Sequence, residues 1–252
     1  MSRLIRKFIE LNRRASRYLN SFLPVSVTQD GNVFFLNEIL PYAFAPGQVV
    51  FDIGGGAQPY VDTKLKQRFG LRTTGIDISR EELEAAPPGT YDEIVVADIS
   101  TLRLQSEADV VICQATLEHL ADTEGAVKAI ADLMQPGAKA YFFAPSRNAV
   151  FARINLLLPQ RLKEKLLYTV SPEVEDHQGF PARYDKCTPR EIEKLFNDCE
   201  LEIVERHLFW MSSYFMILTP VFVLWRLWQG AFWIFSHENA AETFIYIVRK
   251  AS

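Results

Sequence analysis

Cysteine is scarce in this chain, which has only three among 252 residues, at Cys113, Cys187 and Cys199. Their odd number and wide separation show neither a disulfide framework nor the paired spacing of a zinc site, and they favour a reducing compartment. An excess of positive charge is also missing, because the formal net charge is −4. Nucleic acid is therefore not expected as a partner. Because the cysteines favour a reducing compartment, we predict a cytoplasmic protein.

The first 20 residues lack the uninterrupted apolar run of a signal peptide. Apolar side chains alternate there with one acid, Glu10, and with six cations: Arg3, Arg6, Lys7, Arg13, Arg14 and Arg17. This pattern predicts a basic amphipathic helix, followed by a linker that completes residues 1–45. Such a helix suits the anionic inner surface of a membrane, to which we expect peripheral or monotopic attachment.

Short apolar runs bounded by turn residues alternate with helical patterns from residue 46 onward. The runs lie at residues 49–53, 73–78, 94–99, 109–113 and 140–144, with helical periodicity at 62–69 and 123–134. Runs of this kind are typical of strands that are buried on both faces of a sheet. They predict an α/β fold with a doubly wound, mostly parallel sheet and a ligand crevice at the carboxyl ends of its strands.

The alternation changes near the end of the chain. Thr188 and Pro189 open a helix with a cap and a proline at its first position. Residues 201–209 and 243–248 then read as strands without an ordinary crossover helix between them, so the last of seven strands is expected to be antiparallel. We predict one Rossmann-like domain over residues 46–252, with a substrate-region insert at 147–187 and an apolar insert at 210–236.

Three glycines, Gly54, Gly55 and Gly56, directly follow the run at residues 49–53. Glycines at such a turn let backbone N–H groups approach a ligand closely. Asp77 ends the next strand, about 20 residues further on, where a carboxylate can accept hydrogen bonds from ribose hydroxyls. The pattern predicts a nucleoside site; the alternative is that Asp77 only caps the following turn.

Polar residues after the other strands extend this pattern. Asp52 precedes the glycines, Asp98 and Ile99 follow the third strand, and residues 113–120 after the fourth contain the segment Leu-Glu-His-Leu. The series resembles the class I S-adenosylmethionine-dependent methyltransferases, over residues 45–250, and the last segment resembles their small-molecule branch.

The resemblance implies a role for each part of the series. Gly54 and Gly56 would pass under the methionine part of S-adenosylmethionine, Asp77 would hold the ribose, and Asp98 with Ile99 would contact the adenine. The residues that it assigns to cofactor binding are Asp52, Gly54, Gly55, Gly56, Asp77, Ile78, Asp98, Ile99 and Gln114.

Two histidines are the candidates for a general base in methyl transfer to a hydroxyl. His119 follows the fourth strand on the rim of the crevice, although it could equally cap or pack against the next helix. His177 lies in the insert after the fifth strand, where substrate loops fall. The acids Glu173, Glu175 and Asp176 in the same insert are expected to be solvated, so no metal is predicted.

Residues 210–235 carry a single charge, Arg226, among many aromatic and aliphatic side chains. About 20 such residues suffice for a transmembrane helix. The strands predicted on both sides pair with each other, however, so both flanks must lie on one side of any membrane. Because Pro220 divides the segment and Gly230 interrupts it, we expect a shallow hairpin or a pair of interfacial helices; a substrate lid or a homodimer face is the alternative.

Taken whole, the chain resembles membrane-associated bacterial methyltransferases of surface-polysaccharide or lipid pathways. This resemblance implies O-methylation of a lipid-linked glycan or another amphipathic acceptor at the cytoplasmic membrane surface. A first alternative is a quinone-like hydrophobic acceptor, with the apolar insert as its lid. A second is a non-catalytic scaffold, which the intact Asp52, Gly54, Gly56, Asp77 and Asp98 disfavour.

Overall fold

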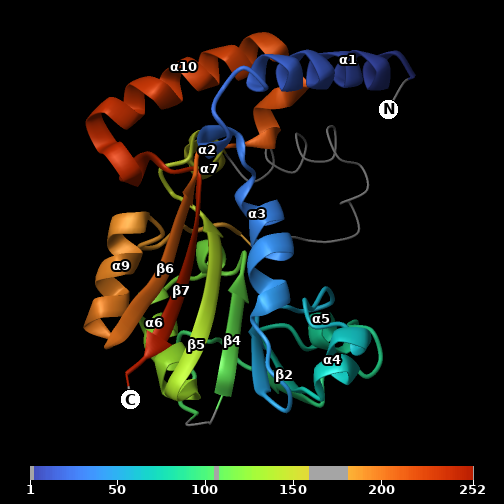
Figure 1. Ribbon diagram of the computed structural model, residues 1–252, viewed down its shortest axis with the longest axis vertical. Helices are drawn as coiled ribbons and strands as arrows, with labels where there is room; N and C mark the ends of the chain where they lie inside the picture. The colour runs from blue at the N-terminus through green and yellow to red at the C-terminus, as the bar shows by residue number, and fades with distance from the viewer. Residues whose placement is uncertain (1–2, 105–107, 159–180, 252) are drawn as a thin grey trace.

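The computed structural model describes residues 3–104, 108–158 and 181–251, and its centre is a seven-stranded sheet in the order β3-β2-β1-β4-β5-β7-β6 (Figure 1). Its strands are β1 Val49–Ile53, β2 Arg72–Asp77, β3 Glu93–Val96, β4 Ala108–Gln114, β5 Met134–Pro145, β6 Leu201–Phe209 and β7 Thr243–Lys250. β7 runs antiparallel to both of its neighbours, and the remaining pairs are parallel. The predicted sheet, with its antiparallel last strand, is confirmed.

Three of the helices between the strands begin at a residue whose side chain caps the first turn. Asp62 accepts the N–H of Leu65 at the start of α4 Thr63–Phe69, and Asp122 accepts that of Gly125 at the start of α6 Thr123–Leu133. Thr188 caps α9 Pro189–Asp198 in the same way. The other described α-helices are α1 Arg3–Asn20, α2 Val25–Thr28, α3 Gly31–Phe34, α5 Arg80–Glu84, α7 Val150–Leu157 and α10 Thr219–Ser236.

The two faces of the sheet are covered by different helices, and neighbouring residues of β5 point to opposite faces. Phe142 packs against Phe196 of α9, with ring centroids 4.9 Å apart. Phe143 stacks on Phe35, at 5.7 Å, on the other face. Phe35 and Leu40 are fully buried, so the segment expected as a linker after α1 instead folds into short helices that complete the core.

The apolar insert folds into a short 3₁₀ helix, η5 Ser213–Ile217, followed by the α-helix α10, which lies alongside α1 at one end of the molecule (Figure 1). The expectation that Pro220 divides the insert and that Gly230 interrupts it is wrong for the following reasons. Pro220 occupies the first turn, where its missing N–H costs nothing. Gly230 has open space around it and is accommodated inside the helix. In the described part of the chain, no helix combines the length and apolarity needed to cross a membrane.

The topology also determines where α10 lies relative to the sheet. β6 and β5 both run antiparallel to β7 and therefore run in the same direction as each other. α10 follows the end of β6, so it lies beyond the edge at which the parallel strands also end. The helices α1 and α10 thus share this edge with the predicted ligand crevice.

Candidate functional site

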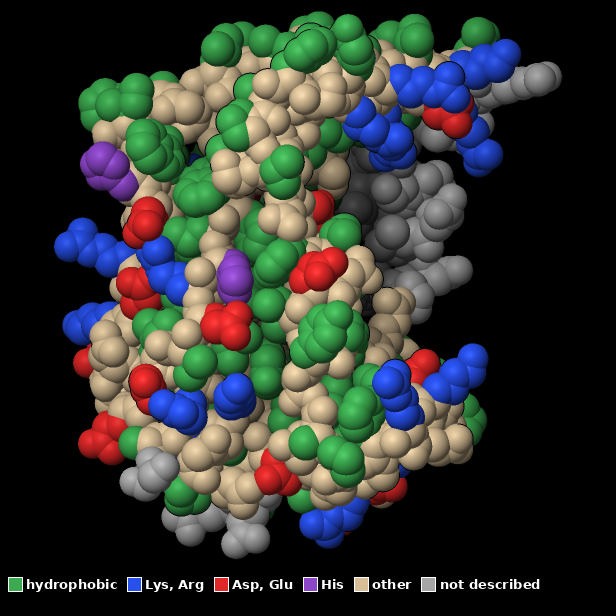
Figure 2. Space-filling model, viewed as in Figure 1, with side chains coloured by type: hydrophobic (Ala, Val, Ile, Leu, Met, Phe, Trp, Pro, Cys, Tyr) green, Lys and Arg blue, Asp and Glu red, His purple; other side chains and the backbone are tan. Residues whose placement is uncertain are grey.

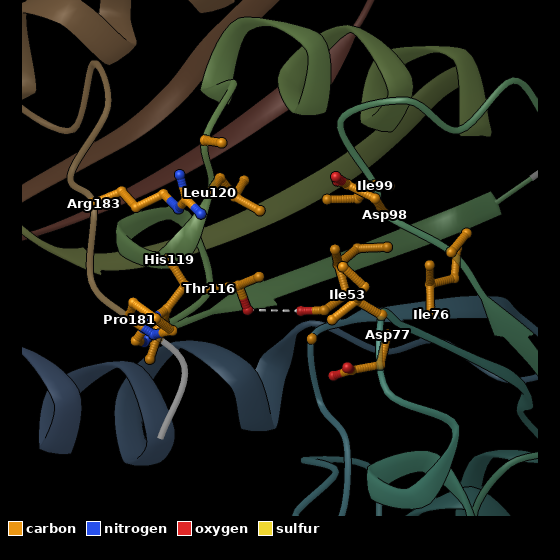
Figure 3. Close-up of a pocket in the computed structure, with 15 residues that line it drawn as sticks. Ile53, Ile76, Asp77, Asp98, Ile99, Thr116, His119, Leu120, Pro181 and Arg183 are labelled. Carbon is orange, nitrogen blue, oxygen red and sulfur yellow. Dashed lines mark hydrogen bonds between the residues drawn. The ribbon is translucent and has the colours of Figure 1, made fainter. Parts of the chain in front are cut away.

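A cavity of about 380 Å³ lies at the carboxyl ends of β1, β2 and β4. Its volume falls in the range of small-molecule sites, about 300–1,000 Å³. The lining residues are Ile53, Gly54, Ile76, Asp77, Ile78, Ala97, Asp98, Ile99, Ala115, Thr116, His119, Leu120, Ala121, Pro181 and Arg183. Asp77 and Asp98 lie on one side and His119 and Arg183 on the other, so the cavity has two chemically different sides (Figure 3).

Most of the predicted site residues meet at this cavity, but four take other positions and one lies outside the described residues. Those that line it are Gly54, Asp77, Ile78, Asp98, Ile99 and His119. Gly55 and Gly56 belong to the loop beside it, and Asp52 lies in β1 just before that loop. Gln114 turns away, since its side-chain amide donates a hydrogen bond to Oδ1 of Asn32 at 3.0 Å. His177 falls within residues 159–180, which the structure does not describe.

The glycine loop can adopt its shape only without side chains at two positions. Gly54 has φ +72°, and a Cβ there would overlap the side chain of Thr116. The Thr116 hydroxyl donates hydrogen bonds to the carbonyl oxygens of Ile53, at 3.0 Å, and Gln114, at 3.1 Å. A Cβ at Gly55 would overlap the carboxylate of Asp52 in the same way. Thr116 therefore sets the distance between β1 and β4 at the cavity, a role that the sequence analysis missed.

Asp52 stabilises the loop and is not part of the cavity wall. It is 5% exposed and accepts hydrogen bonds from the Tyr91 hydroxyl, at 3.2 Å, and from the backbone of Tyr60. Burial raises the pKa of Asp52 to about 6. The Tyr91 hydroxyl also lies 3.4 Å from the carbonyl oxygen of Gly56, so Tyr91 links Asp52 at the end of β1 to the glycine loop.

Two carboxylates mark the opposite side of the cavity from His119. Asp77 ends β2 and accepts the N–H of Ser79 at 2.9 Å, and burial raises its pKa. Asp98 follows β3 and accepts the N–H of Ser100 at 2.9 Å. Each carboxylate is thus fixed by the turn that follows it. Carboxylate oxygens at the ends of adjacent strands, beside a glycine turn, can accept hydrogen bonds from the hydroxyls of a nucleoside.

His119 ends the 3₁₀ turn Leu117–His119 directly after β4. Its side chain is 33% exposed, and its Nε2 lies 4.0 Å from Oε1 of Glu118, which is almost fully buried. The backbone of this turn is fixed by the neighbouring segment, because the Glu118 carbonyl accepts the N–H groups of Arg183, at 2.7 Å, and Tyr184, at 2.9 Å. This arrangement places an imidazole at a fixed position on the cavity wall.

Glu118 is a buried carboxyl that the sequence analysis did not single out, although it stands inside the Leu-Glu-His-Leu segment. Burial raises its pKa to about 8. Among the described residues, its Oε2 has no hydrogen-bond partner. A carboxyl in such surroundings is stable in its neutral form at pH 7, since a buried unpaired charge is costly.

This raised pKa predicts how stability depends on pH. In the unfolded chain Glu118 ionises near pH 4.5, whereas in the fold it stays protonated to about pH 8. The folded state thus binds more protons in this interval, and the free energy of unfolding falls as pH rises from 5 to 8. Glu118→Gln is expected to flatten that fall, by about 1.4 kcal/mol for each pH unit of the interval at most.

Urea unfolding at pH 5, 6, 7 and 8 measures this dependence, with the exposed Glu81→Gln as the matched control. Asp52 and Glu242 add slopes of the same sign, because burial raises their pKa values to about 6 and about 7. They are unchanged in both variants. A Glu118→Gln protein that keeps the full wild-type slope would contradict the buried, neutral state of this carboxyl.

Comparison with known proteins adds a family to this geometry. Residues 51–142 match the family described as the methyltransferase domain. The ubiquinone biosynthesis O-methyltransferase of Albidiferax ferrireducens is 30% identical over 151 residues, which cover 56% of this chain and 58% of that protein. The chain therefore spans less than two thirds of this relative's length.

A second relative and a solved structure extend over more of the chain. The ubiquinone biosynthesis O-methyltransferase of Vibrio parahaemolyticus is 28% identical over 208 residues, which cover 78% of this chain and 81% of that protein. The crystal structure of a SAM-dependent methyltransferase from Methanosarcina mazei matches with a TM-score of 0.52 and 20% identity, over 85% of this chain and 97% of that one. Both the glycine loop and the Asp77 and Asp98 strand ends lie inside the matched family region.

Proposed function

We propose that this chain, a class I S-adenosylmethionine-dependent methyltransferase by its domain and fold, methylates a hydroxyl of a quinone-like hydrophobic acceptor. The predicted resemblance to that family is confirmed by the match over residues 51–142 and by the fold. The observation that carries the proposal is the two-sided cavity, in which strand-end carboxylates face His119 and Arg183. The names of the relatives support a quinone-like acceptor.

The residues on the first side of the cavity fit the cofactor. Gly54 takes a backbone conformation that brings the loop to the cavity wall, and Asp77 and Asp98 supply fixed acceptors at neighbouring strand ends. Ile78 and Ile99 add apolar surface on both sides of these acceptors, which suits a flat adenine ring. S-adenosylmethionine, when bound, supplies an electrophilic methyl group on a positively charged sulfur.

The residues on the second side would position the acceptor. His119 is within reach of a hydroxyl that enters between it and the glycine loop, and it would take the hydroxyl proton as the oxygen gains the methyl group. Arg183 lies beside it on the cavity wall and can donate hydrogen bonds to a neighbouring oxygen of the acceptor. Much of the rate then comes from holding the two reacting atoms about 3 Å apart.

Replacement of His119 by alanine tests this assignment. We expect kcat for transfer of a labelled methyl group to an alkylated catechol to fall about 10²- to 10⁴-fold, the usual contribution of a general base. Binding of S-adenosylmethionine should change little, because His119 lies across the cavity. His207→Ala, which removes a partly exposed histidine of β6, is the matched control. Equal kcat values for His119→Ala and the wild type would remove His119 from the reaction.

A lipid-linked glycan, the acceptor that the sequence pattern favoured, is the second candidate. It is supported by the apolar surfaces of α1 and α10 at the same edge of the sheet as the cavity. The same labelled assay distinguishes the two acceptors, with a short prenyl-linked sugar offered in parallel with the alkylated catechol. Label on the sugar alone would favour the glycan, and label on the catechol alone would favour the quinone-like acceptor.

A further inference from the structure

Helices α1 and α10 lie near opposite ends of the sequence, yet hydrogen bonds join them into a single unit. The backbone N–H of Thr219 donates to Oδ1 of Asn12 at 2.9 Å, and the Ser16 hydroxyl donates to the carbonyl of Met216 at 3.2 Å. Further along, the guanidinium of Arg226 donates to Oδ1 of Asn20 at 2.5 Å. The polar side chains of α1 are thus used to hold the start and middle of α10. We call the two helices together the helix platform.

The opposite face of the helix platform leaves large apolar side chains in solvent. Leu4 of α1 is 81% exposed and Phe235 of α10 is 83% exposed. Figure 2 shows hydrophobic side chains along the upper edge of the molecule, over both helices, with Lys and Arg gathered over α1. Exposed residues of this size are Phe8, Leu11 and Tyr18 on α1 and Leu224, Trp228 and Ile234 on α10.

The platform also contains an open apolar groove of about 760 Å³. It lies between the end of α1, the following turn and α10. Its walls include Leu19, Leu23, Trp210, Phe222, Leu227 and Trp233. This volume and the mostly apolar lining suit a hydrocarbon chain.

Charge identifies the surface that would cover these side chains. The whole chain has a net charge of −4, yet α1 is strongly basic. Its exposed cations are Arg6, Lys7, Arg13, Arg14 and Arg17, against the single acid Glu10. Cations next to exposed Leu, Phe, Trp and Tyr are typical of helices that lie at the boundary between lipid headgroups and acyl chains. A second copy of the same chain would bring two basic helices together, which is unfavourable.

We propose that the helix platform docks the protein on an anionic lipid bilayer, with its exposed apolar side chains at the headgroup boundary and an acyl chain in the groove. The platform lies beyond the carboxyl edge of the sheet, so docking turns the cavity of Asp77 and His119 toward the lipid. A hydrophobic acceptor could then reach the cavity without crossing water. This consequence rests on the proposed function, whereas the docking itself does not.

Vesicle flotation with phosphatidylglycerol–phosphatidylcholine mixtures tests the docking. The wild type should float with the anionic vesicles, and less so at high salt or with pure phosphatidylcholine. Leu224→Glu combined with Phe235→Glu changes two exposed positions that are 11 residues apart and so share one face of α10. Arg13→Glu combined with Arg14→Glu reverses two cations. Each pair should weaken vesicle binding by about tenfold or more.

Matched controls lie on elements away from the helix platform (Figure 1). Tyr42→Glu changes an 81% exposed aromatic residue, and Lys64→Glu combined with Arg72→Glu reverses two exposed cations. Both should float like the wild type, and all variants should bind S-adenosylmethionine equally, which separates docking from the cavity. Point changes are preferred to deletion of α10, because Phe222 and Trp225 are buried.

Three results would overturn the proposal. One is a folded wild type that stays with the soluble fraction. Another is equal loss of flotation in the controls. The third is a wild type that is a dimer by light scattering, binds no vesicles and becomes monomeric when Leu224→Glu and Phe235→Glu are combined. That result would make the platform a homodimer face.

Discussion

Replacement of Asp77 by alanine is expected to weaken binding of S-adenosylhomocysteine roughly 10- to 100-fold, because a hydrogen bond to a charged group contributes about 1.5–3 kcal/mol. The carboxylate ends β2 at the cavity and is already oriented by the N–H of Ser79. Its partly buried position makes the hydrogen bonds to a ribose stronger than they would be in water. Calorimetric titration of the purified variant and the wild type measures the difference.

Asp122→Ala is the matched control for Asp77→Ala. Asp122 also accepts a backbone N–H at 2.9 Å, that of Gly125, but it is absent from the cavity lining. Both variants should lose some thermal stability, and only Asp77→Ala should lose affinity. If the two variants bind S-adenosylhomocysteine equally well, then Asp77 serves only as a turn cap.

Gly54→Ala should impair both binding and stability, with a larger effect on binding. Gly54 has φ +72°, where alanine costs about 1–2 kcal/mol, and the new Cβ would overlap Thr116. The hydroxyl of Thr116 bonds to the strand end of β1, so its displacement distorts the cavity wall. We expect a lower Tm and an affinity for S-adenosylhomocysteine reduced by about tenfold or more.

Gly137→Ala separates the two causes. Gly137 has φ +82°, but its surroundings are open and it lies away from the cavity. It should therefore show the backbone cost alone, seen as a lower Tm with unchanged affinity in calorimetry. An affinity of Gly54→Ala equal to that of Gly137→Ala would show that the close approach at Gly54 has no part in the site.

Local patterns were enough to predict the sheet and one side of the cavity. Strand runs, the cap at Thr188 and the glycine turn all act within a few residues, and each is found where expected. Gly54, Asp77 and Asp98 converge because parallel strands end at a common edge. The expected positions of these residues therefore follow from the order of strands alone.

Contacts between distant segments were beyond the reach of such patterns. Gln114 bonds to Asn32, 82 residues away, and so serves to hold α3 rather than to line the cavity. The segment after α1 looks like a linker by its composition, yet Phe35 fills a space on the sheet that only the folded chain creates. Likewise, Pro220 and Gly230 suggested that the apolar insert is interrupted. Both are accommodated within α10, because Pro220 lies in its first turn and Gly230 has open space around it.

Glu242 illustrates how the helix platform is tied to the sheet. It lies at the start of β7, is 2% exposed and accepts the indole N–H of Trp225 at 3.1 Å. α10 is thereby fixed to the edge of the sheet at which the cavity lies. The proposed docking and the proposed reaction thus share one side of a rigid arrangement.

The most direct test of the central claim is a crystal structure of the protein with S-adenosylhomocysteine. The account predicts ribose hydroxyls within hydrogen-bond distance of the Asp77 carboxylate, the adenine beside Asp98 and Ile99, and the sulfur facing the side of the cavity that holds His119. A ligand bound elsewhere on the chain, with Asp77 turned to protein groups only, would contradict it.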